Sequence, residues 1–202
     1  MIVGALLVLA FLVGSIPFGY LIGRAFYRTD IRAQGSGNIG AMNAMRSLGK
    51  RGAIAVLILD ALKGFAPVAL MQHVVPGDLA AALAAALAVI GHCYSPWLGF
   101  KGGKGVATSV GALFGIAWPL GLIAIAGWLV GAALTRYSSV GSMLAAVVAI
   151  PALWFSTHSP ILTLYGLLIA VLIVYAHREN IARLRSGTEN RIRLGKTPPN
   201  QG

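Results

Sequence analysis

Two glycine-rich segments of this chain combine the residue types that proteins use to hold a phosphate group. The first is GSGNIG at residues 35–40, and the second is GFKGGKG at residues 99–105. Glycines let successive backbone N–H groups converge on an anion without interference from Cβ atoms. Lys104 stands almost directly before an apolar segment whose helical N-terminus would carry positive partial charge. Each segment therefore predicts a phosphate-binding loop.

Polar side chains strengthen the prediction for the first segment. Ser36, Asn38 and Asn43 supply hydrogen-bonding groups, and Arg46 supplies a planar guanidinium that matches phosphate oxygens. The alternative interpretation is an ordinary flexible loop with positive charge at a membrane surface.

The second segment is not a Walker A loop, because glycine follows Lys104 where that motif needs serine or threonine. The alternative interpretation of the second segment is that its two lysines only set the membrane topology.

A third polar group stands near the C-terminus in YAHRENIARL, residues 175–184. If one helix continues through this segment, His177, Asn180 and Ile181 share one face and Glu179 falls on another. A histidine and an amide at a membrane surface would orient a hydroxyl or a phosphate. The alternative is a basic helix end that lies on anionic lipid.

Four further polar residues stand within or beside apolar segments. Ser142 is expected to face inward just below the surface that carries the glycine-rich loops. For His92, lining the site and hydrogen-bonded packing remain equally open. Asp60 and Lys63, three residues apart on one expected helix, predict a structural ion pair.

Several other chemistries are excluded by the composition. Cys93 is the single cysteine, so neither an intramolecular disulfide nor a thiolate metal site is possible, and the three aspartates are too far apart to form a metal cluster. We therefore expect no metal and no cofactor. The segment HVVPGD, His73 to Asp78, matches a His-x4-Asp catalytic pattern, but we expect a coincidence because it lies on the side opposite the cationic loops. No nucleic-acid partner is expected, because no aromatic platform accompanies the basic tail.

The elements that must position these residues are membrane helices. Of the 202 residues, 57% are hydrophobic and only 10% are charged, and the mean hydropathy is +0.80, far from an ordinary soluble domain. Segments long enough to span a bilayer lie at residues 2–23, 53–72, 79–98, 140–155 and 161–176. The block at residues 106–134 is either one overlong helix or two helices broken at Trp118-Pro119, where proline opposes continuation.

The distribution of positive charge favours two helices in that block, which gives seven in total. Fifteen of the 16 Lys and Arg residues then lie on one side, in segments 24–52, 98–106, 135–139 and 177–202, with Lys63 the exception. Six helices would place the basic tail opposite the basic first loop, against the positive-inside rule. The expected fold is an all-α integral membrane protein with its N-terminus outside, its C-terminus in the cytoplasm, and cytoplasmic glycine-rich loops forming the site. We expect a single domain at 1–195 and a short flexible tail at 196–202.

Four motifs in order resemble a known family. GSIPFGYLIG, DIRAQGSGNIGAMNAMRSLG, GHCYSPWLGFKGGKGVAT and YAHRENIARLRSGTE are similar, in sequence and spacing, to the bacterial acyl-phosphate:glycerol-3-phosphate acyltransferases, the PlsY family. The resemblance implies a seven-helix plasma-membrane enzyme that moves a fatty acyl group from acyl phosphate to the 1-hydroxyl of sn-glycerol 3-phosphate. The products would be lysophosphatidic acid and phosphate, at the first step of bacterial phospholipid synthesis. The implied partners are these two substrates and membrane lipid, with no obligate protein partner.

The resemblance also implies roles for individual residues. The implied catalytic residues are Ser36, Arg46, Lys104, His177 and Asn180. Glycerol phosphate would be bound by Arg46, Lys104, Ser142, His177 and Asn180. Acyl phosphate would be bound by Gly35, Ser36, Gly37, Asn38, Gly40, Asn43, Lys101, Gly102 and Gly103.

The chemistry expected from these residues is direct attack by the glycerol hydroxyl, without an acyl-enzyme, because no G-x-S-x-G elbow is present. The proton goes either to His177 or to a substrate phosphate oxygen, and we favour the phosphate, whose pKa near 6 suits the task. Glu179 is the one carboxylate expected near the cleft, on the wrong face. An anion transporter is the alternative function, and the near absence of charge from the outer half disfavours it.

Overall fold

The computed structural model describes residues 1–192, and this part of the chain is helical and contains no strand. Two short 3-10 helices, η1 (Ile31–Ala33) and η2 (Pro96–Leu98), lie in loops. The α-helices are α1 (Ile2–Ser15), α2 (Phe18–Tyr27), α3 (Ala41–Ser47), α4 (Gly49–Val74), α5 (Asp78–Cys93), α6 (Val106–Ile116), α7 (Trp118–Thr135), α8 (Ser138–Thr157), α9 (Pro160–Ala176) and α10 (Arg178–Arg185). The expected tail at 196–202 lies outside the described residues.

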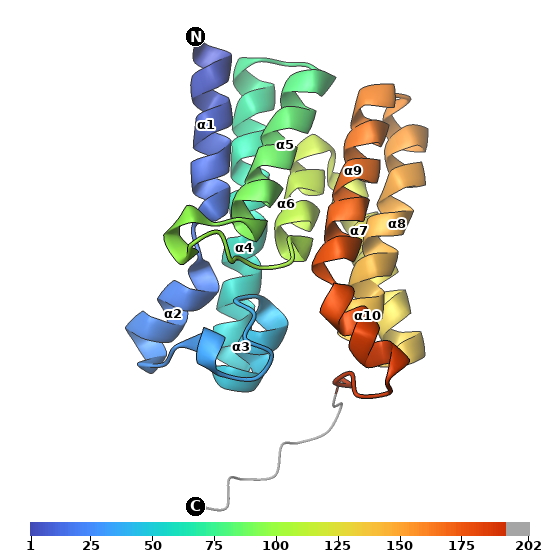
Figure 1. Ribbon diagram of the computed structural model, residues 1–202. Helices are drawn as coiled ribbons and strands as arrows, with labels where there is room; N and C mark the ends of the chain where they lie inside the picture. The colour runs from blue at the N-terminus through green and yellow to red at the C-terminus, as the bar shows by residue number, and fades with distance from the viewer. Residues whose placement is uncertain (193–202) are drawn as a thin grey trace, which may run out of the picture.

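The long helices run side by side in a bundle (Figure 1). Helices α1, α4, α5 and α6 pack against one another, as do α7, α8 and α9, and α5 meets α9 between the two groups. The shorter helices α2, α3 and α10 gather at the end of the bundle opposite the N-terminus (Figure 1). The loop that joins α5 to α6 lies nearer the middle of the molecule, at the level of the junction between α1 and α2 (Figure 1).

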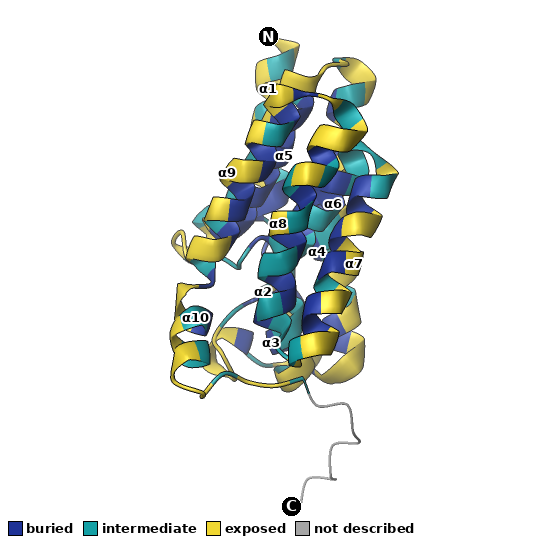
Figure 2. Cartoon of the chain, turned by 90° about the vertical axis from the view of Figure 1, so that its right-hand side faces the viewer, coloured by how far each residue is buried: buried dark blue, intermediate teal, exposed yellow. Residues whose placement is uncertain are grey.

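The outer surface of the bundle is apolar enough for lipid. Figure 2 shows exposed residues along the outside of the helices and buried residues between them. On α9 the exposed side chains of Leu164, Leu168 and Val171 follow one another at helical spacing and form an apolar stripe. Such a stripe would be costly in water and is favourable against acyl chains.

Four helices are long and apolar enough to cross a membrane by themselves: α4, α5 with its extension to Leu98, α7 and α8. Two bent pairs, α1 with α2 and α9 with α10, each pass the same test, which raises the number to six. Helix α6 is apolar but has only 11 residues. The protein is therefore a multi-pass, all-helical membrane protein, and the break expected at Trp118-Pro119 is confirmed between α6 and α7.

Two expectations about helix continuity are wrong. The span expected at residues 2–23 bends by 45° between α1 and α2, because Pro17 has no N–H group to continue the helix. The helix expected to continue through residues 175–184 bends by 56° at His177. There the imidazole Nδ1 bonds to the Ile173 carbonyl, 2.8 Å away, so the side chain competes for an acceptor within the helix.

Small residues let the helix backbones approach closely. A Cβ atom at Gly64 of α4 would overlap the Thr108 carbonyl of α6, and one at Gly111 of α6 would overlap the Ala61 carbonyl of α4. In α5 the alanine-rich run at residues 80–88 supplies five buried alanines, Ala81, Ala82, Ala84, Ala85 and Ala88. Such close packing at small residues is usual for helices that associate in lipid.

Candidate active site

A cavity of about 550 Å³ lies between the two helix groups, at the end of the bundle that holds α3 and α10. Its walls come from the first loop and from α3, α4, α6, α7, α8 and α10. Nine of the residues singled out in the sequence line this cavity, although they are spread over most of the chain: Ser36, Asn38, Gly40, Asn43, Arg46, Lys104, Ser142, His177 and Asn180.

The GSGNIG loop owes its shape to two glycines and to the side chain of Asn43. Gly35 and Gly37 have φ angles of 58° and 69°, in the left-handed region that favours glycine. The Asn43 side chain accepts from the Ser36 N–H at 2.8 Å and donates to the carbonyls of Ile31 and Gln34 at 2.9 and 3.1 Å. Because this amide is used within the loop, Asn43 acts on the cavity mainly by fixing the position of Ser36.

Lys104 and Asn180 meet although they are 76 residues apart. The Lys104 ammonium donates to the Asn180 side-chain carbonyl, and the Asn180 NH₂ group donates to a Glu189 carboxylate oxygen at 2.6 Å. Ser139 donates to the same oxygen at 2.9 Å, and Arg183 Nε donates to the other at 2.7 Å. A hydrogen-bonded network thus joins the loop before α6, helices α8 and α10, and the segment after α10 at the polar end of the cavity.

The network shifts the titration of its members. Burial is the main cause that lowers the pKa of Lys104, and the nearby positive charge of Arg183 adds to it. Burial alone would raise the pKa of Glu189, but hydrogen bonds from Asn180, Arg183 and Ser139 outweigh it and lower that pKa. The carboxylate is therefore ionised, and it orients Asn180 and Arg183 beside Lys104.

His177, which follows the last residue of α9, presents a neutral imidazole to the cavity. A carbonyl oxygen only accepts, so the bond from Nδ1 to the Ile173 carbonyl places the proton on Nδ1 and leaves Nε2 as an acceptor. Burial lowers the pKa of His177 to about 4. Nε2 can therefore accept a hydrogen bond from a hydroxyl, and it is only weakly basic.

The second glycine-rich segment, residues 99–105, contributes to the cavity through its C-terminal end. Gly105, at φ 80°, caps the N-terminus of α6, and Gly105, Val106 and Ala107 line the cavity. Unpaired N–H groups in this first helical turn supply positive partial charge there. The glycine-rich stretch thus ends in an anion-favouring helix terminus beside Lys104.

Two of the glycine N–H groups in this segment are used within the protein and are not free for an anion. The Gly102 and Gly103 N–H groups donate to the carbonyls of Cys93 and His92, each at 3.0 Å. Lys101 is exposed and does not line the cavity, and neither do Gly35, Gly37, Gly102 and Gly103. For these five residues, contact with a substrate stays a prediction.

Among the polar residues that line the cavity but were not assigned to the site from the sequence are Ser139, Arg183 and Glu189. The expectation that Glu179 is the one carboxylate near the cleft is also wrong, because Glu179 is exposed, whereas Glu189 and Asp60 line the cavity. The available signal was Gly187, whose φ of 72° lets the chain reverse after α10. Thr188 N–H then bonds back to the Arg183 carbonyl at 2.8 Å, and this turn returns Glu189 to the arginine.

The polar residues of the helices behave largely as expected. Lys63 and Asp60 form a buried ion pair at 2.6 Å, and Lys63 also donates to the Ile16 carbonyl at the bend between α1 and α2. Of the two alternatives for His92, the structure supports lining the site, because His92 lines the cavity. It is also buried, but its Nδ1, 3.7 Å from Asp60, has no hydrogen-bond partner among the described residues. His73 is exposed near the turn between α4 and α5, at the far end of the bundle from the cavity (Figure 1).

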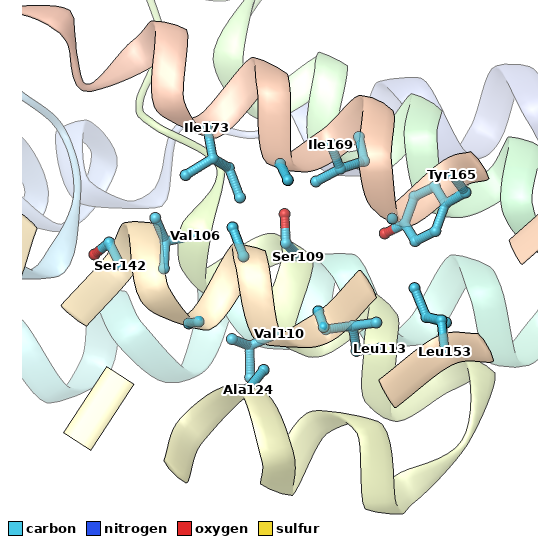
Figure 3. Close-up of a pocket in the computed structure, with 15 residues that line it drawn as sticks. Val106, Ser109, Val110, Leu113, Ala124, Ser142, Leu153, Tyr165, Ile169 and Ile173 are labelled. Atoms are coloured by element: carbon cyan, nitrogen blue, oxygen red, sulfur yellow. The ribbon is translucent and has the colours of Figure 1, made fainter. Parts of the chain in front are cut away.

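A second, smaller cavity of about 20 Å³ lies between α6, α8 and α9 (Figure 3). The buried hydroxyl groups of Ser109 and Tyr165 have no hydrogen-bond partner among the described residues, and apolar side chains form most of its wall. Its volume is about that of one water molecule. A phosphorylated substrate therefore fits only the larger cavity.

Known proteins share both the sequence and the fold of this chain. Residues 4–187 match the family model described as "Glycerol-3-phosphate acyltransferase". The glycerol-3-phosphate acyltransferase of Synechococcus sp. (strain JA-2-3B'a(2-13)) is 49% identical over 90% of each chain. That of Rhodopseudomonas palustris (strain BisB5) is 47% identical over 93% of this chain and 95% of the relative.

Two crystal structures of PlsY (YgiH), an integral membrane glycerol 3-phosphate acyltransferase, have the same fold. The glycerol 3-phosphate form aligns with a TM-score of 0.91 and 37% identity, over 95% of this chain and 96% of PlsY. The lysophosphatidic acid form aligns with a TM-score of 0.88 and 36% identity, over 95% of each chain. With its cationic cavity, its membrane helices and these relatives, the chain belongs to the glycerol-3-phosphate acyltransferase family.

Proposed function

We propose that this acyltransferase moves a fatty acyl group from acyl phosphate to the 1-hydroxyl of sn-glycerol 3-phosphate and releases lysophosphatidic acid and phosphate. One observation carries the proposal: the cavity that holds Arg46, Lys104 and Arg183 at its polar end continues between apolar side chains of α4, α6 and α7. A cavity with a cationic end and an apolar part suits one small phosphorylated substrate and one substrate that carries an acyl chain. The forms in which PlsY was crystallised name the same acceptor and the same product.

In this proposal the two substrates bind to different parts of the polar end of the cavity. Glycerol 3-phosphate is held by Arg46, Lys104, Ser142, His177 and Asn180, with Glu189 and Arg183 positioning Asn180 from behind. The phosphate of the donor lies between the GSGNIG loop, where Ser36 and Asn38 line the cavity, and the N-terminus of α6. Both anions then meet fixed positive charge, which stabilises the departing phosphate without rearrangement.

Transfer proceeds by direct attack. The glycerol 1-hydroxyl oxygen forms a bond to the acyl carbon, the bond from that carbon to the phosphate oxygen breaks, and the hydroxyl proton passes to a phosphate oxygen. His177 Nε2 accepts a hydrogen bond from the hydroxyl and orients it. With a pKa of about 4, the imidazole matches the proton less well than a phosphate whose pKa is about 6.

The membrane placement belongs to the same proposal. Seven spans, with α6 as a short one and α2, α3 and α10 at the cytoplasmic surface, place the basic loops in the cytoplasm of a bacterium and the N-terminus outside the plasma membrane. The chain works as one domain over residues 1–195, without metal, cofactor, nucleic acid or an obligate protein partner.

The test is acyl transfer by the purified protein in detergent, with palmitoyl phosphate, labelled glycerol 3-phosphate and EDTA. We expect labelled lysophosphatidic acid, lost with Lys104→Ala and retained with Lys50→Ala, which removes an exposed lysine outside the cavity. No product from the folded protein would overturn the proposal. Phosphate uptake into liposomes that contain the protein would then support the transporter alternative.

A further inference from the structure

The apolar part of the cavity, which we call the arm, extends from the polar end into the bundle between three helices. Its walls are residues at helical spacing: Leu57 and Ala61 on α4, Val110 and Phe114 on α6, and Ile125 and Leu129 on α7. Helix α6 starts beside the middle of α4, where Thr108 meets Gly64, and α7 runs in the opposite direction, back toward the polar end of the cavity (Figure 1). The deepest residues of the arm are therefore Ala61, Phe114 and Ile125.

Phe114 stands at the bottom of this arm. It lies eight residues beyond the first residue of α6, which is about 12 Å along a helix that rises 1.5 Å per residue. Below it the arm is closed, since a Cβ at Gly115 would lie 2.8 Å from the Val68 Cβ of α4. Gln72 of α4 also donates to the Gly115 carbonyl at 3.0 Å. The backbones of α4 and α6 thus leave no room beyond the Phe114 ring.

The position of the ring depends on a glycine in the neighbouring helix. The ring lies so close to Gly121 of α7 that a Cβ atom there would overlap it. Gly121 itself does not line the cavity. A methyl group at residue 121 can therefore affect the arm only by displacing the Phe114 ring.

We propose that the Phe114 ring, seated against Gly121, is the floor that sets which acyl-chain lengths this enzyme prefers. The inference rests on the proposed function, because it takes the acyl chain of the donor as the occupant of the arm. Leu57 and Leu129 are 49% and 54% exposed on the lipid side, so the chain enters sideways. Carbons beyond the floor must turn out into the bilayer. Acyl-chain length is selected by steric fit, because the lipid and the walls of the arm are equally apolar.

Two substitutions shift the preference in opposite directions. Phe114→Ala deepens the arm and raises the kcat/KM of hexadecanoyl phosphate relative to that of dodecanoyl phosphate by about tenfold, the low end of what a misfit methylene costs in an apolar pocket. Gly121→Ala pushes the ring into the arm and lowers the same ratio. Because Gly121→Ala acts through the ring, the double variant has the profile of Phe114→Ala alone.

The experiment measures kcat/KM for acyl phosphates from octanoyl to octadecanoyl with each variant. Phe65→Ala, which removes a lipid-facing ring outside the cavity, and Gly4→Ala, which meets no neighbouring atom, are the matched controls. We expect the control profiles to match the unchanged protein. An unmoved ratio in Phe114→Ala, or a double variant that differs from it, overturns the inference even if Gly121→Ala alone does not fold. If the unchanged protein uses no acyl phosphate, the proposed function has failed instead.

Discussion

Replacement of His177 by glutamine separates the two routes by which the hydroxyl proton can leave. The bond from Nδ1 to the Ile173 carbonyl fixes the tautomer, so Nε2 is the atom that meets the substrate. As the base, His177 would contribute about 10²–10⁴-fold to the rate of the chemical step. As an acceptor that orients the hydroxyl, it contributes one hydrogen bond, about 0.5–1.5 kcal/mol.

We expect the smaller effect. In His177→Gln, the kcat at saturating glycerol 3-phosphate falls by less than about tenfold, because one hydrogen bond of about 1 kcal/mol corresponds to roughly a fivefold change. The kcat/KM still rises through the second ionisation of a phosphate, near pH 6. The assay is the initial rate of lysophosphatidic acid formation from about pH 5 to pH 8, with the folding of the variant checked by its Tm in detergent. A fall in kcat of more than about a hundredfold in a folded variant would mean that His177 is the base.

The remaining predictions concern stability and are measured as the Tm in detergent. Glu189→Gln removes the charge that Arg183 and Asn180 bond and lowers the Tm, whereas Glu179→Gln, at an exposed carboxylate, leaves it unchanged. Gly64→Ala lowers the Tm strongly, because its methyl group overlaps a backbone carbonyl of α6 that cannot turn aside, and an equal Tm would refute that close approach. Burial lowers the pKa of His177 to about 4 from 6.5, so the unfolded chain binds the extra proton and stability falls as the pH drops through that interval. His177→Gln makes this part of the pH profile flatter, and a slope equal to that of the unchanged protein would contradict the burial of the imidazole.

The sequence predicted the grouping of the site better than its local geometry. Arg46, Lys104, His177 and Asn180 were assigned to one substrate by the family resemblance, and the distribution of positive charge placed their segments on the same side of the membrane. The bond between Lys104 and Asn180 spans 76 residues, and no local pattern specifies such a contact beyond placing both ends at one surface.

The errors arose where the backbone changes direction. The 45° bend at Pro17 was hidden by continuous hydrophobicity on both sides of it, although a proline interrupts the hydrogen bonds of any helix. The bend at His177 depends on a side-chain bond to the backbone, which hydropathy does not report. Glu189 was missed because its place depends on the turn at Gly187, and a short polar segment after a helix contains no periodic pattern from which to predict one.

The glycines of the GFKGGKG segment have different structural roles. Gly102 and Gly103 donate to the last carbonyls of α5, and a Cβ at either residue would overlap atoms of His92. Gly105 instead provides the left-handed turn that starts α6. The first two hold the loop against α5, and only the third helps to aim a helix terminus at the cavity. Lys104 lies between Gly103 and Gly105, so its backbone is held next to α5, and its ammonium meets Asn180. The loop therefore favours an anion mainly through where it places one lysine and one helix N-terminus, and less through its own N–H groups.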